Sequence, residues 1–405
     1  MRIALYHNLP SGGAKRHTYE QVRELAQRGH ELEEFAPSTA DLSYCSFVPF
    51  VKRQHIFNLV PVSQTKQRIP LLTPYLHTFQ GIRTLQRTAQ VNRVIAKEID
   101  AGNFDLVFVK DCHITMNPYV LRYLNTKTVF QCHHGLRHRV EMSQTTGAEP
   151  TRPLDRIKEL YYGPARKAFD HKFEMDEIRN IQSASVVLTN SEYSKHLIAN
   201  HYQVNSRVVY PGINTELFRP LSIEKMDYVL CVGSIIYSKG HRFLISALAC
   251  IDAGKRPKLF IAANSRDHEE EKVVRSMALR LGVELHIEEI TDDERLVQVY
   301  NQAKVFVYAP MQEALGMAPL EAMACGTPVV AVGEGGVRET VLDNITGWVV
   351  QRDPHKFAKR LEALLEDDKT RLSMGQAGID YVMSQWTWQR AVDRLEHEFG
   401  LAGGS

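Results

Sequence analysis

Short apolar runs alternate with longer helical stretches along the whole chain, and this alternation constrains the fold more than any other feature of the sequence. The first run, at residues 3–6, is followed by a glycine turn at 10–13 and by a stretch of helical periodicity that ends near residue 29. A strand, a glycine turn and a helix in this order open a doubly wound parallel sheet. Further short buried strands are predicted at residues 106–109, 128–132 and 186–189.

A second cycle of the same kind begins after a predicted linker near residues 212–222. Its strands are predicted at residues 228–232, 259–263, 285–287, 305–308 and 328–332, with helices between them. Two such cycles in 405 residues predict an α/β protein with two facing Rossmann-like domains and a ligand cleft between them. We assign residues 1–212 to the first domain, 213–385 to the second, and 386–405 to a C-terminal helix that packs back toward the first.

Two stretches carry no clear period, whereas the C-terminal helix is strongly apolar. Residues 44–80 are interrupted by prolines and are predicted to form an irregular insertion, and residues 143–154 are predicted to form a loop. The last helix, near 386–400, is expected to be buried through its large apolar residues, which are Trp386, Trp388, Val392, Leu395 and Phe399.

The charge distribution is uneven although the net charge is only +2. Residues 1–218 hold 27 Lys and Arg against 20 Asp and Glu, a net +7, and residues 219–405 hold 22 against 27, a net −5. A basic half indicates an anionic partner, either a phosphorylated acceptor or an anionic membrane surface, and chance variation of a solvated surface is the alternative. Nothing in the composition points to a nucleic-acid partner.

The sequence contains no stretch that approaches 18 consecutive apolar residues, and no signal-peptide layout precedes the first predicted strand. Its six cysteines are scattered and never form a Cys-x-x-Cys pair, which is typical of reduced thiols. We therefore expect a cytoplasmic protein, with peripheral contact to the inner face of the membrane left open.

The strongest local signal is the segment QEALGMAPLEA at residues 312–322, between an apolar strand and a helix that ends near Gly326. A glycine inside a strand-to-helix turn leaves backbone N–H groups pointing outward, which suits a diphosphate. Glu313 and Glu321 are spaced to accept hydrogen bonds from hydroxyl pairs at both ends of an elongated ligand. Alternatively, Glu313 caps the helix and Glu321 is a surface charge.

Two more turns of the second domain favour anions. GSIIYSKG, at residues 233–240, brings Lys239 to the end of the first strand, and GEGGVRE, at 333–339, follows a later strand. Because the carboxyl ends of parallel strands meet at one edge of a sheet, we expect all three turns to lie close together.

These motifs resemble those of the retaining glycosyltransferases of family 4, which have the GT-B fold. The likeness rests on the Glu-x7-Glu segment, on VGSxxxxKG and on PVVAVGEGGVRETV. In the N-terminal half it rests on SGGAKRHTYEQVRELAQRGHELEEF, VVLTNSEYSKHLI and VVYPGINTELF. The likeness covers most of the chain except residues 44–100 and 140–165. It implies an N-terminal domain that binds the acceptor and a C-terminal domain that binds a nucleotide sugar.

The resemblance implies a donor site in the second domain. Glu313 would hold hydroxyls of the transferred sugar, Glu321 would hold the ribose hydroxyls, and Lys239 would neutralise the leaving phosphate. The full set of donor-binding residues expected from the resemblance is Gly12, Gly13, Gly233, Ser234, Lys239, Glu313, Leu315, Gly316, Met317 and Glu321. Leu315 to Met317 would supply backbone N–H groups, and Gly12 and Gly13 would let the first N-terminal turn approach both substrates.

Ser234 departs from the family pattern, which often has an arginine directly after the Val-Gly of the lysine turn. One of the two usual phosphate charges is therefore missing. Arg242, or a basic residue of the N-terminal half, is the expected substitute.

A dense basic group follows the predicted strand at 128–132. His133 best matches the cleft histidine of the family, which reaches the donor sugar, and His134 is the second choice. We expect His134, Arg137 and Arg139 to bind a phosphorylated acceptor; an ordinary basic surface is the alternative. A zinc site is not favoured, because adjacent histidines on a strand point to opposite faces, so no metal is expected.

The sequence thus predicts a retaining, metal-independent hexosyltransferase with Lys239, Glu313 and His133 in catalytic roles. It contains no Asp-x-Asp metal motif, no Walker A motif and no Gly-x-Gly-x-x-Gly fingerprint. We expect no cofactor, a UDP- or GDP-sugar as co-substrate, and a glycan (as in cell-envelope polysaccharide), lipid-linked or small-molecule acceptor. The alternatives are another GT-B chemistry, such as an epimerase or a phosphorylase, and a sugar-nucleotide-binding protein without catalysis.

Overall fold

The computed structural model describes residues 1–62, 73–132 and 153–403, and the chain forms two compact units. Unit 1 comprises Met1–Asn190, Ser194–Val209 and Val392–Ser405, and unit 2 comprises Ser191–Tyr193 and Tyr210–Ala391. Each unit has its own parallel sheet and its own apolar core.

Unit 1 is built on a sheet whose described strands are all parallel, in the order β3-β2-β1-β4-β5-β6-β7. Both faces of this sheet are buried: Ile3 and Leu5 pack in one apolar cluster, and Ala4 and Tyr6 in another. The two clusters separate because successive side chains of a strand point to opposite faces. The strands are β1 (Arg2–Asn8), β2 (Glu31–Pro37), β3 (Arg53–Phe57), β4 (Leu106–Cys112), β5 (Thr128–Cys132), β6 (Val186–Thr189) and β7 (Ser206–Val208).

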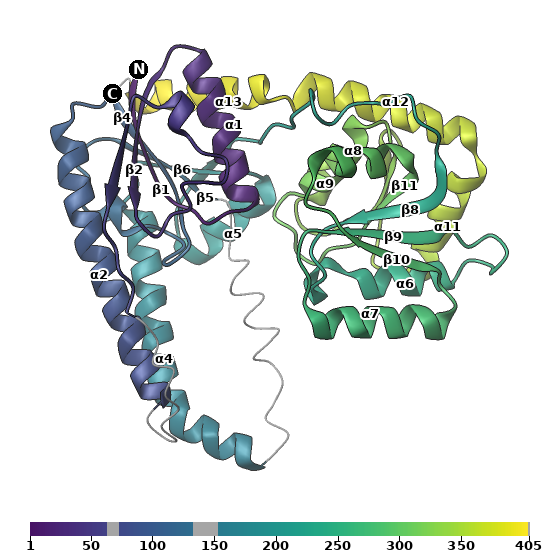
Figure 1. The fold of residues 1–405 in the computed structure, drawn as a ribbon, viewed down its shortest axis with the longest axis horizontal. Coiled ribbons are helices and arrows are strands. Elements are labelled where there is room, and N and C mark those ends of the chain that lie inside the picture. The colour runs from purple at the N-terminus through teal and green to yellow at the C-terminus, as the bar shows by residue number, and fades with distance from the viewer. Residues whose placement is uncertain (63–72, 133–152, 404–405) are drawn as a thin grey trace. The chain divides into compact units, whose positions relative to one another are not determined.

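Helices connect these strands in the crossovers that a parallel sheet requires. The helices of unit 1 are α1 (Gly13–Gln27), α2 (Thr73–Ala101) and α4 (Pro153–Gln182), with short 3-10 turns η1 (Val48–Phe50) and η2 (Tyr119–Arg122). Helix α5 (Glu192–Tyr202) starts with two residues of unit 2, and from Ser194 on it belongs to unit 1. The long helices α2 and α4 lie side by side and extend beyond the sheet (Figure 1). The C-terminal helix α13 (Trp388–Gly403) adds Val392, Leu395 and Phe399 to the cluster of Ile3 and Leu5.

Unit 2 has a second parallel sheet, in the order β10-β9-β8-β11-β12-β13. Its strands are β8 (Met226–Val232), β9 (Lys258–Ala263), β10 (Leu285–Glu289), β11 (Ala303–Tyr308), β12 (Val329–Val332) and β13 (Gly347–Val350). Its helices are η3 (Tyr237–Lys239), α6 (His241–Ala249), α7 (His268–Leu281), α8 (Asp293–Gln302), α9 (Met317–Ala324), α10 (Val337–Thr340), α11 (Pro354–Glu366) and α12 (Asp368–Gln385). One apolar cluster lies on each face of the sheet: Leu230 belongs to one, and its neighbours Val229 and Cys231 to the other.

The predicted fold class is confirmed, and every predicted strand is present with the expected parallel pairing. The buried C-terminal residues are also confirmed, because Trp386, Trp388, Val392, Leu395 and Phe399 are all less than a tenth exposed. Among the helices that the structure describes, none is long and apolar enough to cross a bilayer.

The prediction of an irregular insertion over residues 44–80 was wrong for much of that stretch. It contains η1, the edge strand β3 and the beginning of α2. Strand β3 is half exposed and rich in polar residues, so it lacks the apolar run that marks a buried strand. Residues 143–152 of the predicted loop lie outside the described residues, and the last two positions, 153 and 154, begin α4.

Candidate active site

The candidate site of unit 2 lies where the strand order of its sheet reverses. Strand β8 begins the unit, yet it pairs with β9 on one side and with β11 on the other, so the crossovers run in opposite directions from these two strands. Ligands of open α/β sheets bind beyond the carboxyl ends of the strands at such a reversal. Lys239 follows β8 and Glu313 follows β11, which places both predicted residues at this edge.

Lys239 and Glu313 form an ion pair. The ammonium nitrogen Nζ of Lys239 lies 2.6 Å from Oε2 of Glu313, and both side chains are only 15% and 12% exposed. The hydroxyl of Tyr308, at the end of β11, also donates to Oε2 of Glu313 at 3.3 Å. The pair therefore presents a fixed cation and a fixed carboxylate beside each other.

Gly240 explains how Lys239 reaches this position. Its φ is +73°, and a Cβ placed on it would lie 1.9 Å from the carbonyl oxygen of Ala309. Only glycine fits a left-handed residue packed this closely against another strand end. The lysine turn is thus held against the end of β11 by backbone contact.

Helix α9 begins at the predicted diphosphate seat. Gly316 precedes the helix at φ +92° and, being a glycine, offers no side-chain cap to the N–H groups of the first turn. Free N–H groups at a helix N-terminus attract anions. Glu321, in the middle of α9, accepts a hydrogen bond of 2.7 Å from the hydroxyl of the buried Tyr300. Burial and the neighbouring Glu321 raise the pKa of Tyr300, so this hydroxyl stays a donor.

The turn that follows β12 packs against the backbone of the turn that carries Glu313. The N–H of Gly336 donates to the carbonyl oxygen of Glu313 at 2.9 Å. A Cβ on Gly335 would lie 2.2 Å from that same oxygen, and one on Gly336 would lie 2.3 Å from the carbonyl oxygen of Ala314. The three turns that the sequence predicts to be close together are therefore in contact.

Comparison with known families agrees with this geometry. A model described as "Glycosyltransferase Family 4" matches residues 11–217, about half of the chain, and one described as "Glycosyl transferases group 1" matches residues 213–381. The chain belongs to glycosyltransferase family 4. The resemblance identified from the sequence is confirmed.

The relatives that match the chain in sequence are glycosyltransferases as well. The chain is 29% identical to the D-inositol 3-phosphate glycosyltransferase of Corynebacterium diphtheriae over 245 residues, and 30% identical to that of Corynebacterium aurimucosum over the same number. These matches cover 55% of the chain and 57% and 58% of the relatives, so the chain spans less than two thirds of their length.

Among solved structures, the sucrose-phosphate synthase of Thermosynechococcus elongatus is similar with a TM-score of 0.72 and 20% identity, and the match covers 100% of both chains. Anabaena HepE, solved in complex with UDP and glucose, is similar with a TM-score of 0.65 and 16% identity over 99% of both chains. This likeness shows the fold, which is the GT-B fold.

Ser234, where family 4 often has an arginine, is part of a hydroxyl network. Its Oγ donates to Oδ1 of Asn264 at 3.0 Å and accepts from Oγ of Ser265 at 2.9 Å. Arg242, the expected substitute cation, instead pairs with both oxygens of Glu270. Lys239 is thus the cation that the described residues place against Glu313.

The predicted donor residues of unit 1 occupy the equivalent turn of the first sheet. Gly12 has φ +135°, and α1 begins at Gly13 without a side-chain cap. Neither glycine would bring a Cβ within 4 Å of another atom, so Gly12 is required by its backbone angle and not by space. His133, His134, Arg137 and Arg139 lie outside the described residues, and their roles remain predictions.

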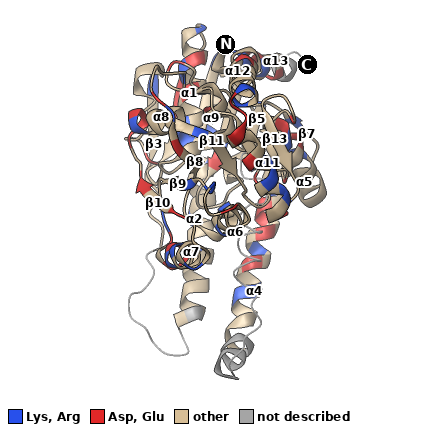
Figure 2. Cartoon of the chain, turned by 90° about the vertical axis from the view of Figure 1, so that its right-hand side faces the viewer, with Lys and Arg blue, Asp and Glu red and all other residues tan. Residues whose placement is uncertain are grey.

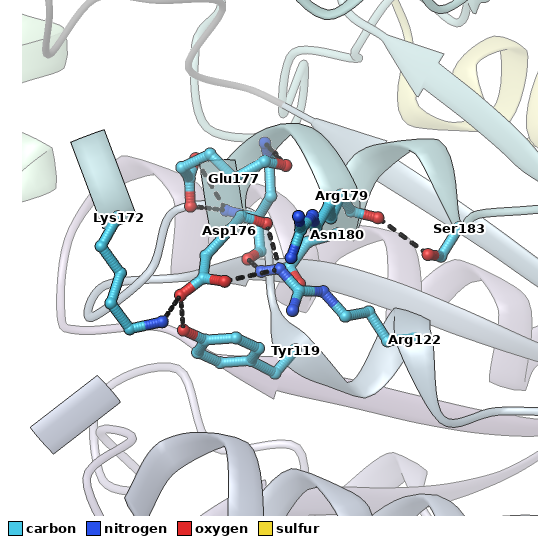
Figure 3. A network of polar contacts seen from close by, with 9 residues as sticks. Tyr119, Arg122, Lys172, Asp176, Glu177, Arg179, Asn180 and Ser183 are labelled. Atoms are coloured by element: carbon cyan, nitrogen blue, oxygen red, sulfur yellow. Dashed lines mark hydrogen bonds and ion pairs between the residues drawn. The ribbon is translucent and has the colours of Figure 1, made fainter. Parts of the chain in front are cut away.

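A buried polar network fixes helix α4 to the loop after β4 (Figure 3). Asp176 of α4 accepts hydrogen bonds from Tyr119 and Arg122 of η2. The carboxylate of Glu177 accepts from the backbone N–H of Asn117 at 3.1 Å, and burial raises the pKa of this carboxyl well above its usual range. These hydrogen bonds connect the C-terminal half of α4 to η2 and to the loop before it, within unit 1.

Sequence reasoning missed three residues that support the site, namely Tyr300, Tyr308 and Glu339. Tyr308 ends β11 and Tyr300 lies on α8, and their hydroxyls orient the two glutamates. Tyrosines in apolar runs are normally core residues, so the sequence carries no signal for them. Glu339 belongs to the GEGGVRE segment, which did give a signal, although its partner residues are far away in sequence.

Proposed function

We propose that this family 4 protein transfers a hexose from a nucleotide sugar to an acceptor hydroxyl, with retention at the anomeric carbon and without a metal ion. The observation that carries this proposal is the 2.6 Å pair of Lys239 with Glu313, a residue close in sequence to the N-terminus of α9, whose N-cap residue is Gly316. A phosphate-binding cation and a hydroxyl-binding carboxylate at one sheet edge suit a ligand that contains both groups.

In this proposal each charged group acts at a different part of the donor. Lys239 and the N–H groups at the start of α9 stabilise the negative charge that develops on the leaving diphosphate. Glu313 holds hydroxyls of the hexose, and Glu321, oriented by Tyr300, holds those of the ribose. The leaving phosphate takes the proton of the acceptor hydroxyl, so that no protein nucleophile is needed. The positive field of Lys239 and α9 takes the place of a metal.

For the substrates we propose a UDP-sugar donor and a phosphorylated polyol or sugar acceptor. The names of the relatives support the acceptor, since D-inositol 3-phosphate glycosyltransferase and sucrose-phosphate synthase both refer to phosphorylated compounds. The Anabaena structure with UDP and glucose supports the base. A GDP-sugar donor, and a glycan or lipid-linked acceptor, are the alternatives that the test distinguishes.

A thermal-shift panel of UDP-, GDP- and ADP-sugars identifies the donor, because a ligand that binds only the folded state raises its stability. The best donor is then incubated with inositol phosphate, fructose phosphate or unphosphorylated sugars in buffer with EDTA. We expect release of the nucleotide diphosphate with a phosphorylated acceptor, at an unchanged rate in EDTA, and an α-linked product from an α-linked donor. Turnover of a donor without any acceptor would favour the epimerase or phosphorylase alternative.

We also propose peripheral binding to the cytoplasmic face of an anionic membrane through the extended ends of α2 and α4. Over residues 73–91 and 161–169 the helix pair holds four cations, Arg83, Arg87, Arg166 and Lys167, and no Asp or Glu. The first residues of α4, 153–160, add two cations and two carboxylates to the sequence of this end. Residues 92–101 and 170–182, nearer the sheet, hold four cations against six carboxylates (Figure 2).

Exposed aromatic side chains accompany the basic end of the pair. Phe79 is 52% exposed, Tyr161 is 44% exposed and Tyr75 is 38% exposed. The hydroxyl of Tyr75 donates to the carbonyl oxygen of Tyr161 at 2.6 Å, so the two helices present their rings together. Aromatic rings and cations together suit the interface of an anionic bilayer.

Sedimentation with lipid vesicles tests this surface. One set of vesicles is pure phosphatidylcholine, and the other also contains phosphatidylglycerol at about 30–40%. We expect binding only to the anionic vesicles, and a loss of binding of about tenfold in a Phe79→Ser and Arg83→Ser double variant. Arg93→Ser with Val94→Ser, on the same helix nearer the sheet, is the matched control. Equal binding of the two double variants would contradict the proposed surface.

A further inference from the structure

The carboxylate of Glu339 binds two segments that are far from it in the sequence, the start of α5 and Tyr210. It accepts hydrogen bonds from the backbone N–H of Glu192 at 2.8 Å and of Tyr193 at 2.9 Å, which are the first N–H groups of α5. It also accepts one of 2.8 Å from the hydroxyl of Tyr210. Glu339 thus caps the N-terminus of α5 from 146 positions away in the chain, a task normally done by a residue next to the helix.

Both of these segments lie where the chain passes between the two units. Ser191–Tyr193 belongs to unit 2 and is followed by a return to unit 1 at Ser194, and Tyr210 is the residue at which the chain enters unit 2 again. The hydroxyl of Tyr381 further donates to the backbone carbonyl of Glu339 at 3.4 Å. Glu339 therefore binds both segments of unit 2 at which the chain passes from one unit to the other.

The same hydrogen bonds close a ring through the turn that carries Glu313. Ser191, just before α5, donates its hydroxyl to the carbonyl oxygen of Ala314 at 2.5 Å. Gly336, three positions before Glu339, donates its N–H to the carbonyl oxygen of Glu313 at 2.9 Å. A path thus runs from Glu313 through Gly336 to Glu339, then to the start of α5, and back through Ser191 to Ala314.

We infer that Glu339 is a positioning residue for the transfer reaction. By binding the two connecting segments, it fixes the position of the turn that carries Glu313. The expected effect on kcat rests on the proposed function. The expected effect on the structure of the turn rests on the hydrogen-bond ring alone. Small displacements of a group that holds the reacting sugar lower turnover strongly, whereas binding of the distant nucleotide is less sensitive.

Glu339→Gln is the main variant, because it keeps the size of the side chain and removes one of the two carboxylate acceptors. We expect kcat to fall about tenfold while the donor KM stays within about threefold. Ser191→Ala opens the ring at its other end and is expected to give a similar fall. Because both residues act through one ring, the double variant is expected to lose less than the product of the two single effects.

Asp353→Asn is the matched control. Asp353 is also a carboxylate helix cap in unit 2, and it accepts from the N–H groups of His355 at 2.9 Å and Lys356 at 3.0 Å, at the start of α11. This variant loses a helix cap of the same kind without touching the ring. We expect a comparable fall in the thermal midpoint and an unchanged kcat. Equal kcat effects of Glu339→Gln and Asp353→Asn would overturn the inference.

Hydrogen exchange separates failure of this inference from failure of the proposed function, because it needs no substrate. In Glu339→Gln we expect faster exchange in peptides that cover residues 190–195 and also in those that cover 312–318. Faster exchange in the first peptide alone would show an ordinary helix cap and would overturn the inference. If Glu339→Gln does not fold, Tyr210→Phe removes one hydrogen bond of the carboxylate and is expected to give the same paired change in a weaker form; exchange unchanged at 312–318 would again overturn it.

Discussion

The Nζ of Lys239 and Oε2 of Glu313 lie 2.6 Å apart although 74 positions separate the two residues in the chain. They meet because β8 and β11 are neighbours in the sheet and end at the same edge. A second ion pair joins the same two strands near their opposite ends, where Nζ of Lys304 lies 2.7 Å from Oδ1 of Asp227. The two pairs differ in exposure and in what surrounds them, so one can serve as a control for the other.

Lys239→Met is expected to lower the affinity for a nucleotide diphosphate about tenfold, and turnover by more. The variant removes the cation and leaves the carboxylate of Glu313 without its ion-pair partner in a largely buried place, which costs about 1–3 kcal/mol. Isothermal titration with UDP at two salt concentrations measures the loss. Lys304→Met, in the control pair, should leave UDP binding unchanged, and an equal loss in both variants would contradict the proposed phosphate contact.

Gly240→Ala is expected to destabilise unit 2 by about 2–4 kcal/mol. The new Cβ would lie 1.9 Å from the carbonyl oxygen of Ala309 in a backbone with φ +73°, so the lysine turn must move away from the end of β11. Thermal unfolding and UDP binding should both suffer. Gly254→Ala is the control, since its Cβ would have no atom within 4 Å and the residue has no positive φ.

The general architecture could be predicted from the sequence because its signal is local. Apolar runs such as those of β4, β6 and β12 are buried on both faces and stand out against polar neighbours. Strand β2 gives no such signal, since it contains Glu33 and Glu34 in its centre. Glu34 is buried because Nε2 of His7 lies 2.7 Å from its carboxylate, a contact between strands that no local pattern reveals.

The candidate site was predictable to the level of its turns but not of its contacts. Glycines followed by a lysine or a glutamate indicated where anions and hydroxyls bind, and the structure brings Lys239 and Glu313 together. The tyrosines that orient Glu313 and Glu321, and the cap that Glu339 provides for α5, depend on tertiary packing. Arg242 was expected to supply a second phosphate-binding cation, but the sequence carries no sign of its ion pair with Glu270.

Ser234→Arg is expected to strengthen binding of a nucleotide diphosphate several-fold, by supplying the second cation that many family 4 members have at this position. The gain should decrease steeply with salt, because an ionic contact is screened. Ser234→Ala separates this effect from loss of the hydroxyl network with Asn264 and Ser265. Stronger binding in the alanine variant as well would show that the added charge is not the cause.

Lys15 makes the stability of unit 1 depend on pH. Burial lowers the pKa of Lys15 to about 8, and its Nζ lies 3.6 Å from the centre of the Phe47 ring. Because the unfolded chain keeps the proton up to about pH 10.5, the unfolded state binds more protons than the folded state between pH 8 and 10.5, and stability rises with pH there.

Lys15→Met removes this dependence. We expect the variant to be more stable than the wild type at pH 7, and its advantage to shrink by about 1 kcal/mol between pH 7 and pH 9. Urea unfolding of both proteins at the two pH values measures the difference. An advantage that grows with pH would show that the ammonium group stabilises the folded state, contrary to this account.

The most direct test of the donor site compares the wild type with Glu313→Gln in two measurements on the same preparations, the release of nucleotide diphosphate in the presence of acceptor and the Kd of the nucleotide. Glu313 is proposed to hold the transferred sugar and not the nucleotide, so its loss should act on turnover. The account predicts that the wild type turns over, that Glu313→Gln loses about 100-fold or more in kcat, and that the nucleotide Kd changes less than about threefold. A wild type that binds a nucleotide sugar but neither transfers nor hydrolyses it, or a Glu313→Gln variant with unchanged kcat, would contradict it.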